Sequence, residues 1–310
     1  MNGVIIIDKP SGKTSYAVVE NIKRILGVRK VGHTGTLDPL ATGVLPVCIN
    51  EATKLVQFFL MDSKEYRATM LLGIETDTLD IEGKITARKE PCVIRSNIEA
   101  VLSGFVGKIE QTPPRYSAVK YKGKPMYKWA RKGHVVDPLP RMVEVHQITL
   151  EDVELPYVTF SVSCSKGTYI RSLCSDIGEK LGCGACLSAL RRIKSGHFLE
   201  ESAISFENVH DQKKVEILTK NLIPMIDALS RFPAIDVDQK LAGRLRNGYQ
   251  PVIGDMVKNQ VPVLAAGDVV KFVSGGNCLV ALARKLYSFD QISSLDSKEQ
   301  LVEIIRVFNC

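Results

Sequence analysis

The sequence lacks any apolar run that approaches the length of a bilayer-spanning helix, which argues against a helical membrane protein. Its first segment, "MNGVIIIDKP", has only a four-residue apolar run, which ends at Asp8. This segment also lacks a basic first region and a small-residue cleavage site, so it is typical of a strand and not of a signal peptide. We therefore expect no contact with a membrane.

The eight cysteines lack the regular spacing of a disulfide framework, which favours reduced thiols and a cytoplasmic location. Cys183 and Cys186 have C-x-x-C spacing, but a structural zinc site needs a second pair of ligands, which is missing. A redox pair would follow a strand, whereas this pair follows a predicted helix. We predict no metal and treat both cysteines as small side chains, buried or at the surface.

A complete phosphate-binding loop is also missing. Gly12, Lys13 and Thr14 match the end of the motif G-x-x-x-x-G-K-[ST], but the first glycine would have to be residue 7, which is Ile. Without that glycine the loop cannot surround a phosphate with its backbone amides. We therefore expect no nucleotide cofactor and regard a phosphate-loop NTPase as a weak alternative.

What the sequence contains is ordinary for a soluble globular protein, with 45% apolar and 24% charged residues and a net charge of +7. Strands and helices are mixed without a regular βαβ rhythm, which predicts an α+β fold. Its central sheet is expected to be mixed, largely antiparallel and flanked by helices. Beyond Phe232, short apolar runs separated by glycines predict a small β-rich domain. We expect domains over residues 1–231 and 232–310.

Hydrophobic periodicity predicts the main elements. Ser15 is expected to cap a helix that ends at Gly27, and residue 168 is expected to open another helix. Further helices are predicted within 51–60 and 96–107, and strands within 65–73, 141–153 and 157–167.

A basic and aromatic stretch lies within residues 112–134. Cations neutralise phosphates while aromatic faces stack on unpaired bases, so this composition suits looped or single-stranded RNA. An equally good interpretation from these residues alone is a solvated basic loop over a small aromatic cluster. The candidate RNA contacts are Lys120, Lys122, Lys124 and Arg131, interleaved with Tyr116, Tyr121, Tyr127 and Trp129.

Asp38 lies among three glycines and two prolines in the segment "KVGHTGTLDPLATGVLPV". Aspartate before proline is a common helix start, so Asp38 could be the N-cap of a helix that begins at Pro39. A cap does not need the nearby histidine, threonines and three glycines. Glycines permit close approach of another backbone, so we favour a loop that holds one carboxylate against a large ligand.

The segment "GHTGTLDPLATGVL" resembles the signature loop of the TruB family of tRNA pseudouridine synthases. The resemblance extends in family order to "DKPSGKTS", "KEYRATMLLGIETDTLD", "QTPPRYSAVKYKGKPMYKWAR", "CSKGTYIRSLCSDIG" and "LSALRR". These segments cover roughly residues 3 to 200, and the C-terminal part resembles the PUA-type RNA-binding domain that such enzymes carry. The resemblance implies a pseudouridine synthase catalytic domain followed by a PUA-like domain.

The resemblance also implies roles for three residues. Asp38 matches the catalytic aspartate, which acts as nucleophile or as a stabilising anion. Arg171 matches the arginine that pairs with this aspartate and keeps it ionised. Tyr66 matches the tyrosine that lies against the target base and could help to move a proton. The alternatives are an ordinary ion pair for Arg171 and a core aromatic for Tyr66.

Tyr169 and Leu190 match positions that line the substrate pocket. Either could instead be a plain core residue, Leu190 especially, since it fits the buried face of a helix in "LSALRR". His33 matches a residue that contacts the RNA loop, and otherwise would be a loop histidine bonded to threonines. Lys9 matches a family lysine with a structural or phosphate-contacting role. Two interpretations remain for three basic residues, which either contact the RNA backbone or form a solvated face: Arg191, Arg192 and Lys194.

The implied activity is isomerisation of the T-loop uridine of tRNA, position 55, to pseudouridine. The family needs no cofactor: the N-glycosidic bond breaks, the bound uracil turns, and it rejoins the ribose through carbon. We expect a monomer whose partner is the T-arm of tRNA. Two alternatives stay open, a guide-RNA-dependent relative and a tRNA-binding folding factor with secondary catalysis.

Overall fold

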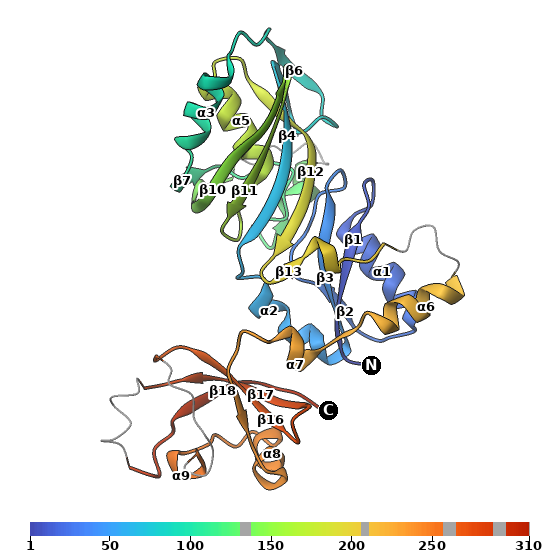
Figure 1. The fold of residues 1–310 in the computed structure, drawn as a ribbon, viewed down its shortest axis with the longest axis vertical. Coiled ribbons are helices and arrows are strands. Elements are labelled where there is room, and N and C mark those ends of the chain that lie inside the picture. Colours follow the sequence, from blue (N-terminus) through green and yellow to red (C-terminus); the bar gives the residue numbers. More distant parts are fainter. Residues whose placement is uncertain (131–137, 206–210, 257–264, 288–295, 310) are drawn as a thin grey trace.

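The computed structural model describes residues 1–130, 138–205, 211–256, 265–287 and 296–309. A ten-stranded mixed sheet fills the larger part of this structure, and a separate four-stranded sheet lies at one end (Figure 1). The predicted α+β class is confirmed. The large sheet is made of β1 (Gly3–Lys9), β2 (Val31–His33), β3 (Thr42–Ile49), β4 (Lys64–Leu72), β7 (Gly107–Gln111), β10 (Arg141–Glu154), β11 (Tyr157–Cys164), β12 (Ala185–Ser195), β13 (Phe198–Leu199) and β14 (Ile223–Pro224).

The strand order in the large sheet is β14-β1-β3-β12-β4-β11-β10-β7, with β2 paired to β3 and β13 paired to β12. Its pairings are antiparallel except between β3 and β12, which run parallel over a short stretch. That parallel contact joins β14, β1 and β3 to the part of the sheet made of β12, β4, β11, β10 and β7. The segment between β2 and β3, which holds Asp38, therefore lies at this seam.

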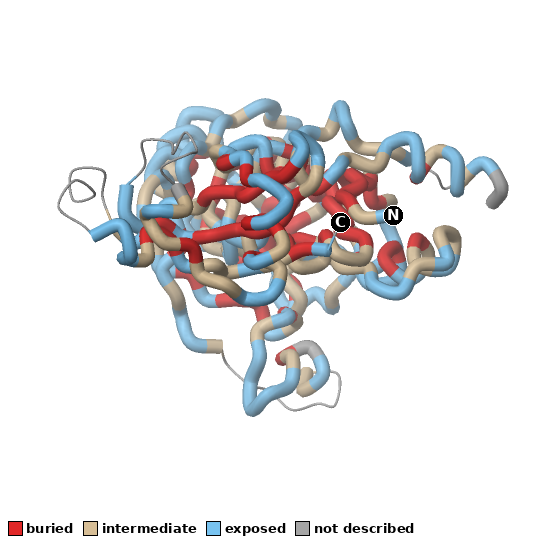
Figure 2. Tube along the Cα trace, turned by 90° about the horizontal axis from the view of Figure 1, so that it is seen from below, coloured by how far each residue is buried: buried red, intermediate tan, exposed pale blue. Residues whose placement is uncertain are grey.

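Alternation along β1 builds two cores, because successive side chains of a strand point to opposite faces. Ile5 and Ile7 join a large core that the helices cover, and Val4 and Ile6 join a second core on the other face. All four side chains are at most 2% exposed. Figure 2 shows these buried segments in the interior, with exposed segments around them.

Three amphipathic helices cover one side of the sheet. In Figure 1, α3 and α5 lie side by side against the strands β10 and β12, and α1 lies next to β2. Thr14, not Ser15, caps α1: its Oγ1 accepts a hydrogen bond from the amide of Ala17 at 3.0 Å, and Gly27 ends the helix in the left-handed conformation as predicted. The bounds are α1 (Ser15–Leu26), α2 (Val56–Phe59), α3 (Arg95–Ser103), α4 (Met126–Ala130), α5 (Ile170–Lys180), α6 (Asp211–Lys220) and α7 (Met225–Ala228).

Two helical alternatives that the sequence left open do not occur. Asp38 lies in an irregular segment, as favoured from the sequence, and no helix begins at Pro39; instead Gly43–Ile49 pairs with β1 within β3 immediately downstream. The segment "LSALRR" belongs to strand β12 and not to a helix. A bulge between Leu187 and Ala189 shifts its register by one residue, which disturbs the alternation that marks a strand. The helix predicted within 51–60 is a 3-10 helix, η1 (Asn50–Leu55), followed by the short α2.

Four shorter strands form two hairpins, and a three-residue 3-10 turn follows β13. One hairpin pairs β5 (Ile74–Thr76) with β6 (Ile85–Arg88), and the other pairs β8 (Lys120–Tyr121) with β9 (Lys124–Pro125). The turn is η2 (Glu200–Ser202). The β8–β9 hairpin falls within the basic and aromatic stretch.

The C-terminal part forms its own sheet, in the order β15-β16-β17-β18, which confirms the predicted small β-rich region. It packs on the second core of the large sheet, where Leu279, Leu282 and Phe308 meet Phe59 and Leu229. We place the domain boundary between residues 231 and 232 as a proposal, just before β15. The remaining elements are β15 (Ala234–Asp236), α8 (Gln239–Arg246), α9 (Ile253–Met256), β16 (Val269–Ser274), β17 (Cys278–Lys285) and β18 (Val302–Val307).

Within the described ranges, no helix is long and apolar enough to cross a membrane. Cys183 and Cys186 are free and buried, as are most of the free cysteines. Cys278 is disulfide-bonded, so the expectation that every cysteine is reduced is wrong for this residue. Irregular spacing in the sequence gives no sign of which sulfur atoms the fold brings together.

Candidate active site

Asp38 lies in an irregular segment between β2 and β3 that the rest of the fold holds in place. The hydroxyl of Ser15, at the start of α1, accepts a hydrogen bond from the amide of Leu37 at 2.8 Å and donates to its carbonyl at 3.1 Å. The carbonyl of Pro39 accepts from the amide of Gly12 at 2.9 Å and from the ammonium of Lys9 at 3.2 Å. Contacts on both sides of Asp38 therefore fix its backbone.

Gly43 is required where this segment enters β3. Its φ is +96°, a conformation that other residues rarely adopt. A Cβ at this position would collide with the backbone carbonyl of Arg192 on β12. The glycine thus permits the close approach of two backbones that the sequence pattern suggests, although here the second backbone belongs to the protein itself.

Arg171 binds Asp38 with both arms of its guanidinium group. Nε lies 2.8 Å from Oδ2 and Nη2 lies 3.2 Å from Oδ1, which is the bidentate geometry of a strong charge-assisted pair. The arginine side chain is 4% exposed, whereas the carboxylate is 31% exposed. The buried cation therefore holds a carboxylate that is itself partly accessible to solvent.

The remaining donors of Arg171 are bound as well. Nη1 donates to the carbonyl of Thr78 at 2.9 Å and Nη2 donates to the carbonyl of Tyr116 at 2.9 Å. Nη1 also lies 3.4 Å from Oδ2 of Asp80, a carboxylate that is 8% exposed. These partners hold the guanidinium so that it can adopt few other positions.

Sequence reasoning did not single out Asp80 or Thr78, although both belong to "KEYRATMLLGIETDTLD". The hydroxyl of Thr78 donates to Oδ1 of Asp80 at 2.6 Å, and the amide of Glu82 donates to the same oxygen at 3.2 Å. These contacts fix the second carboxylate. In the sequence, Asp80 belongs to a run of short polar residues that follows a buried strand. Such a run is typical of a tight turn.

Tyr66 lies on β4, opposite Arg192 of β12 and Val162 of β11. Burial raises the pKa of its phenol, while the charge of Arg192 and a hydrogen bond from it act in the opposite direction, and the charge of Asp38 raises the pKa further. The phenol is therefore neutral near neutral pH. Arg192, opposite Tyr66, donates to the carbonyls of Gly35 and Val44 on either side of Asp38, so the two side chains are held in one region.

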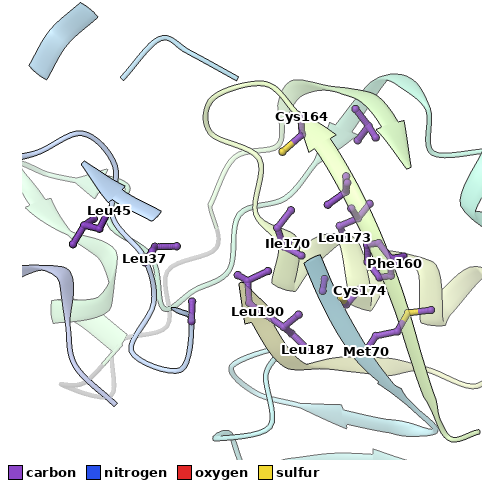
Figure 3. Packing of buried hydrophobic residues seen from close by; sticks show 14 of the residues in the cluster. Leu37, Leu45, Met70, Phe160, Cys164, Ile170, Leu173, Cys174, Leu187 and Leu190 are labelled. Carbon is purple, nitrogen blue, oxygen red and sulfur yellow. The ribbon is translucent and has the colours of Figure 1, made fainter. Parts of the chain in front are cut away.

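Tyr169 and Leu190 flank the same region. Gln111 clamps the backbone of Tyr169 from both sides, since its amide nitrogen donates to the carbonyl at 3.0 Å and its oxygen accepts from the amide at 2.8 Å. The guanidinium of Arg141 stacks on the Tyr169 ring at 4.9 Å. Leu190 is 8% exposed and packs in the large core, where Figure 3 shows it near Ile170.

His33, on β2, accepts a hydrogen bond at Nδ1 from the amide of Gly35 at 3.3 Å. Burial and the charge of Arg192 lower its pKa, so the imidazole is neutral near neutral pH. Lys9 is fully buried, and its ammonium donates to the carbonyls of Pro10, Lys13 and Pro39. Its geometry fits the structural role better than contact with a phosphate.

Lys120, Lys122 and Lys124 lie in the β8–β9 hairpin with their side chains exposed. The ammonium of Lys122 lies 5.4 Å from the centre of the Tyr121 ring, and that of Lys124 lies 5.9 Å from the Trp129 ring. The prediction for Arg131 falls outside the described residues. The structure therefore has features of both interpretations, exposed cations and a small aromatic cluster beneath them.

The three basic residues of β12 do not form a solvated face. Arg191 binds Asp8 at 3.0 Å and Glu200 at 2.8 Å, and Lys194 binds Glu65 at 2.7 Å. Arg192 is 1% exposed. Intramolecular contacts thus account for these cations. Across the described segments, no cluster of three or more His, Cys, Asp and Glu side chains has an arrangement that could hold a metal ion.

Comparisons with known proteins agree with this geometry. Residues 23–170 match the family described as "TruB family pseudouridylate synthase (N terminal domain)", and residues 171–230 match "tRNA pseudouridylate synthase B C-terminal domain". The "tRNA pseudouridine synthase B" of Syntrophus aciditrophicus is 55% identical over 309 residues, covering 100% of this chain and 99% of the relative. That of Geobacter sulfurreducens is 40% identical over 314 residues and covers 100% of both chains.

A solved structure described as "Crystal Structure of a Cbf5-Nop10-Gar1 Complex" contains a chain with a TM-score of 0.76 and 32% identity. The likeness covers 98% of this chain and 84% of that one. A second, "Structure of H/ACA RNP bound to a substrate RNA containing 2'-deoxyuridine", has a TM-score of 0.76 and 30% identity, with 99% and 85% covered. On these matches in sequence and fold, the chain belongs to the TruB family of pseudouridylate synthases.

Proposed function

We propose that this enzyme, an isomerase, converts the T-loop uridine of tRNA, position 55, to pseudouridine, with Asp38 as the catalytic group. The single observation that carries this proposal is the bidentate pair between Arg171 and Asp38, in which the cation is buried and the carboxylate is partly exposed. Full-length relatives named tRNA pseudouridine synthase B support the substrate class. Action on tRNA fits the expected cytoplasmic location.

Asp38 suits a reaction in which the N-glycosidic bond of uridine breaks. Its carboxylate can attack the substrate or stabilise positive charge at the ribose. The neutral phenol of Tyr66 can lie against the extruded uracil and exchange a proton with it. Tyr169 and Leu190 are proposed to form the walls against which the base turns.

RNA binding is assigned to elements around this site. The target base of a folded T-loop must be extruded at a cost of a few kcal/mol, which contacts to neighbouring nucleotides have to offset. The exposed lysines of the β8–β9 hairpin suit the phosphates, and His33 suits the vacated position in the loop. We propose that the four-stranded C-terminal sheet is a PUA-like domain that binds further along the RNA.

The second candidate is a guide-RNA-dependent synthase. The likeness to chains from a Cbf5-Nop10-Gar1 complex and an H/ACA RNP favours it, because the fold is shared over nearly the whole chain. Identity is higher, 55% against 32%, to the relative named tRNA pseudouridine synthase B, so we favour action on tRNA without partner proteins. Activity of the purified chain alone on a tRNA transcript distinguishes the two.

The proposal is tested with Asp38→Asn and the parent chain, measuring pseudouridine at position 55 of an unmodified tRNA transcript. Asparagine keeps the size of the side chain, and Arg171 keeps its contacts to Thr78, Tyr116 and Asp80, so the variant is expected to fold and bind tRNA. We expect an active parent and an inactive variant. Equal activity in both would reduce Asp38 to a structural residue.

A folding factor with secondary catalysis makes a different prediction. In that case Asp38→Asn would lose isomerisation but still help a misfolded tRNA to reach its native structure. An inactive parent that binds tRNA tightly would favour a requirement for partners. Absence of nucleotide binding by the parent would eliminate the phosphate-loop alternative, in which the Gly12 amide is already bonded to Pro39.

A further inference from the structure

Arg192 is one of the largest fully buried side chains of the structure, at 1% exposure. Burying a guanidinium is costly unless its donors and its charge are satisfied, so a buried arginine needs an explanation. On one side its backbone is paired in register with Tyr66 of β4. On the other side it is paired with Gly43 of β3. Arg192 therefore lies directly between β4, which carries Tyr66, and β3, which follows the segment that holds Asp38.

Two donors of Arg192 bind the segment that carries Asp38. Nε donates to the carbonyl of Val44 at 2.6 Å, and Nη2 donates to the carbonyl of Gly35 at 3.2 Å. These carbonyls lie on opposite sides of Asp38 in the sequence. One planar and rigid group thus fixes the distance between the two ends of the segment, which a flexible ammonium could not do.

Tyr66 is paired in register with Arg192, and the positive charge of Arg192 and a hydrogen bond from it lower the pKa of the Tyr66 phenol against the larger effect of burial. In the portion of the chain that the structure describes, no ion pair joins Arg192 to a carboxylate. The acceptors beside its guanidinium are therefore the two carbonyl oxygens and this phenol. A phenol whose oxygen accepts from a cation has its own proton left to donate elsewhere.

We propose that Arg192 is a positioning residue for the isomerisation, tying the Asp38 segment to the Tyr66 hydroxyl and directing the phenol proton toward the bound base. The inference rests on the proposed function and adds a residue to it. Arg192 has no access to the substrate, so it acts only through Asp38 and Tyr66. Its removal should slow the chemical step and leave tRNA binding unchanged.

The neighbouring Arg191 provides a matched control on the same strand. Its guanidinium pairs with Asp8 and Glu200, away from Tyr66 and from the Asp38 segment. Arg192→Lys and Arg191→Lys both keep the positive charge and lose the planar fork. Arg192→Gln removes the buried charge together with its desolvation cost, so it is expected to fold even if the lysine variant does not.

The experiment measures the single-turnover rate of pseudouridine formation at saturating enzyme, the Kd for tRNA, and thermal unfolding of each variant. We expect Arg192→Lys and Arg192→Gln to lower the rate by about tenfold or more, because small misplacements of catalytic groups are costly. The Kd should change by less than about twofold, as for loss of an interaction made only in the transition state. Arg191→Lys should resemble the parent chain.

The loss of rate caused by Arg192→Gln should also depend on the hydroxyl of Tyr66. In a Tyr66→Phe background the hydroxyl is absent, so Arg192→Gln should cost less than it does in the parent chain. Folded Arg192 variants with the parent's single-turnover rate would overturn the inference, as would loss of folding in both variants. A parent chain that does not isomerise the uridine would instead refute the proposed function.

Discussion

At the scale of single residues, the site depends on a few buried cations whose partners are fixed. Arg171 shares its donors among Asp38, Asp80 and two carbonyls, and is only 4% exposed. A charge in such a place is stabilising only when every contact is made, because desolvation offsets much of the attraction. Replacing one of these cations therefore affects geometry and stability together.

Arg171→Lys is expected to lower the single-turnover rate by about 100-fold or more, because lysine cannot bind the Asp38 carboxylate in bidentate fashion. Unfolding free energy should fall by up to about 3 kcal/mol, since carbonyls and Asp80 lose their donors. Rate measurements and urea unfolding check both values. Arg67→Lys, in an exposed pair with Glu151, is the control and should have little effect.

Lys64 gives a prediction for the dependence of stability on pH. Its side chain is buried, and burial together with the charge of Arg192 lowers its pKa to about 8. In the unfolded chain its pKa is about 10.4, so between these values the unfolded state binds the extra proton. This residue therefore adds stability as the pH rises from about 8 to about 10.4.

Lys64→Gln should remove that contribution. Buried thiols and Tyr66, whose pKa values are raised, oppose it in the same pH range, so the parent-minus-variant difference is the quantity to measure. Unfolding by urea at several pH values provides it. A difference that stays constant or falls as the pH rises would contradict the lowered pKa.

At the scale of elements, Gly43 lies where the segment that holds Asp38 enters β3. Because it has no side chain, the backbone of β12 can lie directly against it. Gly43→Ala should destabilise the protein by at least about 2 kcal/mol, because it combines a positive φ with a collision against the Arg192 carbonyl. Gly27→Ala is the control: its φ is +60° and no atom lies within 4 Å of the added Cβ. It should cost only about 1 kcal/mol, which thermal unfolding can distinguish.

The periodicity of apolar residues predicts an element correctly where the spacing along the chain matches the buried face of that element. The helices α1 and α5 and the strands β10 and β11 agree with the sequence prediction because their apolar spacing matches their burial in the fold. The aspartate–proline pair at residue 38 is locally a helix start, but the ladder between β1 and β3 outweighs that preference. In β12, a bulge disturbs the alternation that would have indicated a strand.

The site itself could be predicted only in part. The resemblance named Asp38 and Arg171, and the structure brings them together although they are far apart in the sequence. RNA contact and a solvated face, the two alternatives for Arg192, both require an exposed side chain. Its burial is not visible in the sequence, because arginine is seldom fully buried and no pattern along one strand reveals what lies opposite. Its partners Gly35 and Val44 become neighbours only when β3 and β12 pair in parallel.

At the scale of the whole molecule, the C-terminal sheet is attached through a shared apolar core. Phe308 is fully buried beside Leu55 and Phe59 of the large domain, and Lys54 lies 5.7 Å from the centre of its ring. Lys54 also donates to the carbonyl of Val307 at 2.9 Å. Such an interface couples the stability of the two parts.

Phe308→Ala is therefore expected to destabilise the protein by about 3–5 kcal/mol, the usual cost of removing a buried aromatic ring. Because the core is shared, both sheets should lose stability, and thermal unfolding followed by calorimetry should shift as a whole. The exposed residue Leu286, on the same part of the chain, provides a control when changed to alanine. A shift confined to a small separate transition would show that the C-terminal sheet unfolds alone.

The net charge of +7 matters at this scale because binding to tRNA should release counterions. The Kd is expected to rise steeply with salt, and its logarithm should be linear in the logarithm of salt concentration. Changing Lys120, Lys122 and Lys124 together to glutamine should weaken binding and lower the slope by about one unit per lysine that contacts a phosphate.

A control variant carries the same loss of charge on three exposed lysines of other elements, Lys108, Lys180 and Lys298. If the β8–β9 hairpin contacts the RNA backbone, the hairpin variant should lower the slope more than this control does, because only contacted charges displace counterions. Equal slopes would mean that net charge alone accounts for the salt dependence. A flat Kd for the parent chain between low and moderate salt would exclude phosphate contacts as the source of the energy that extrudes the base.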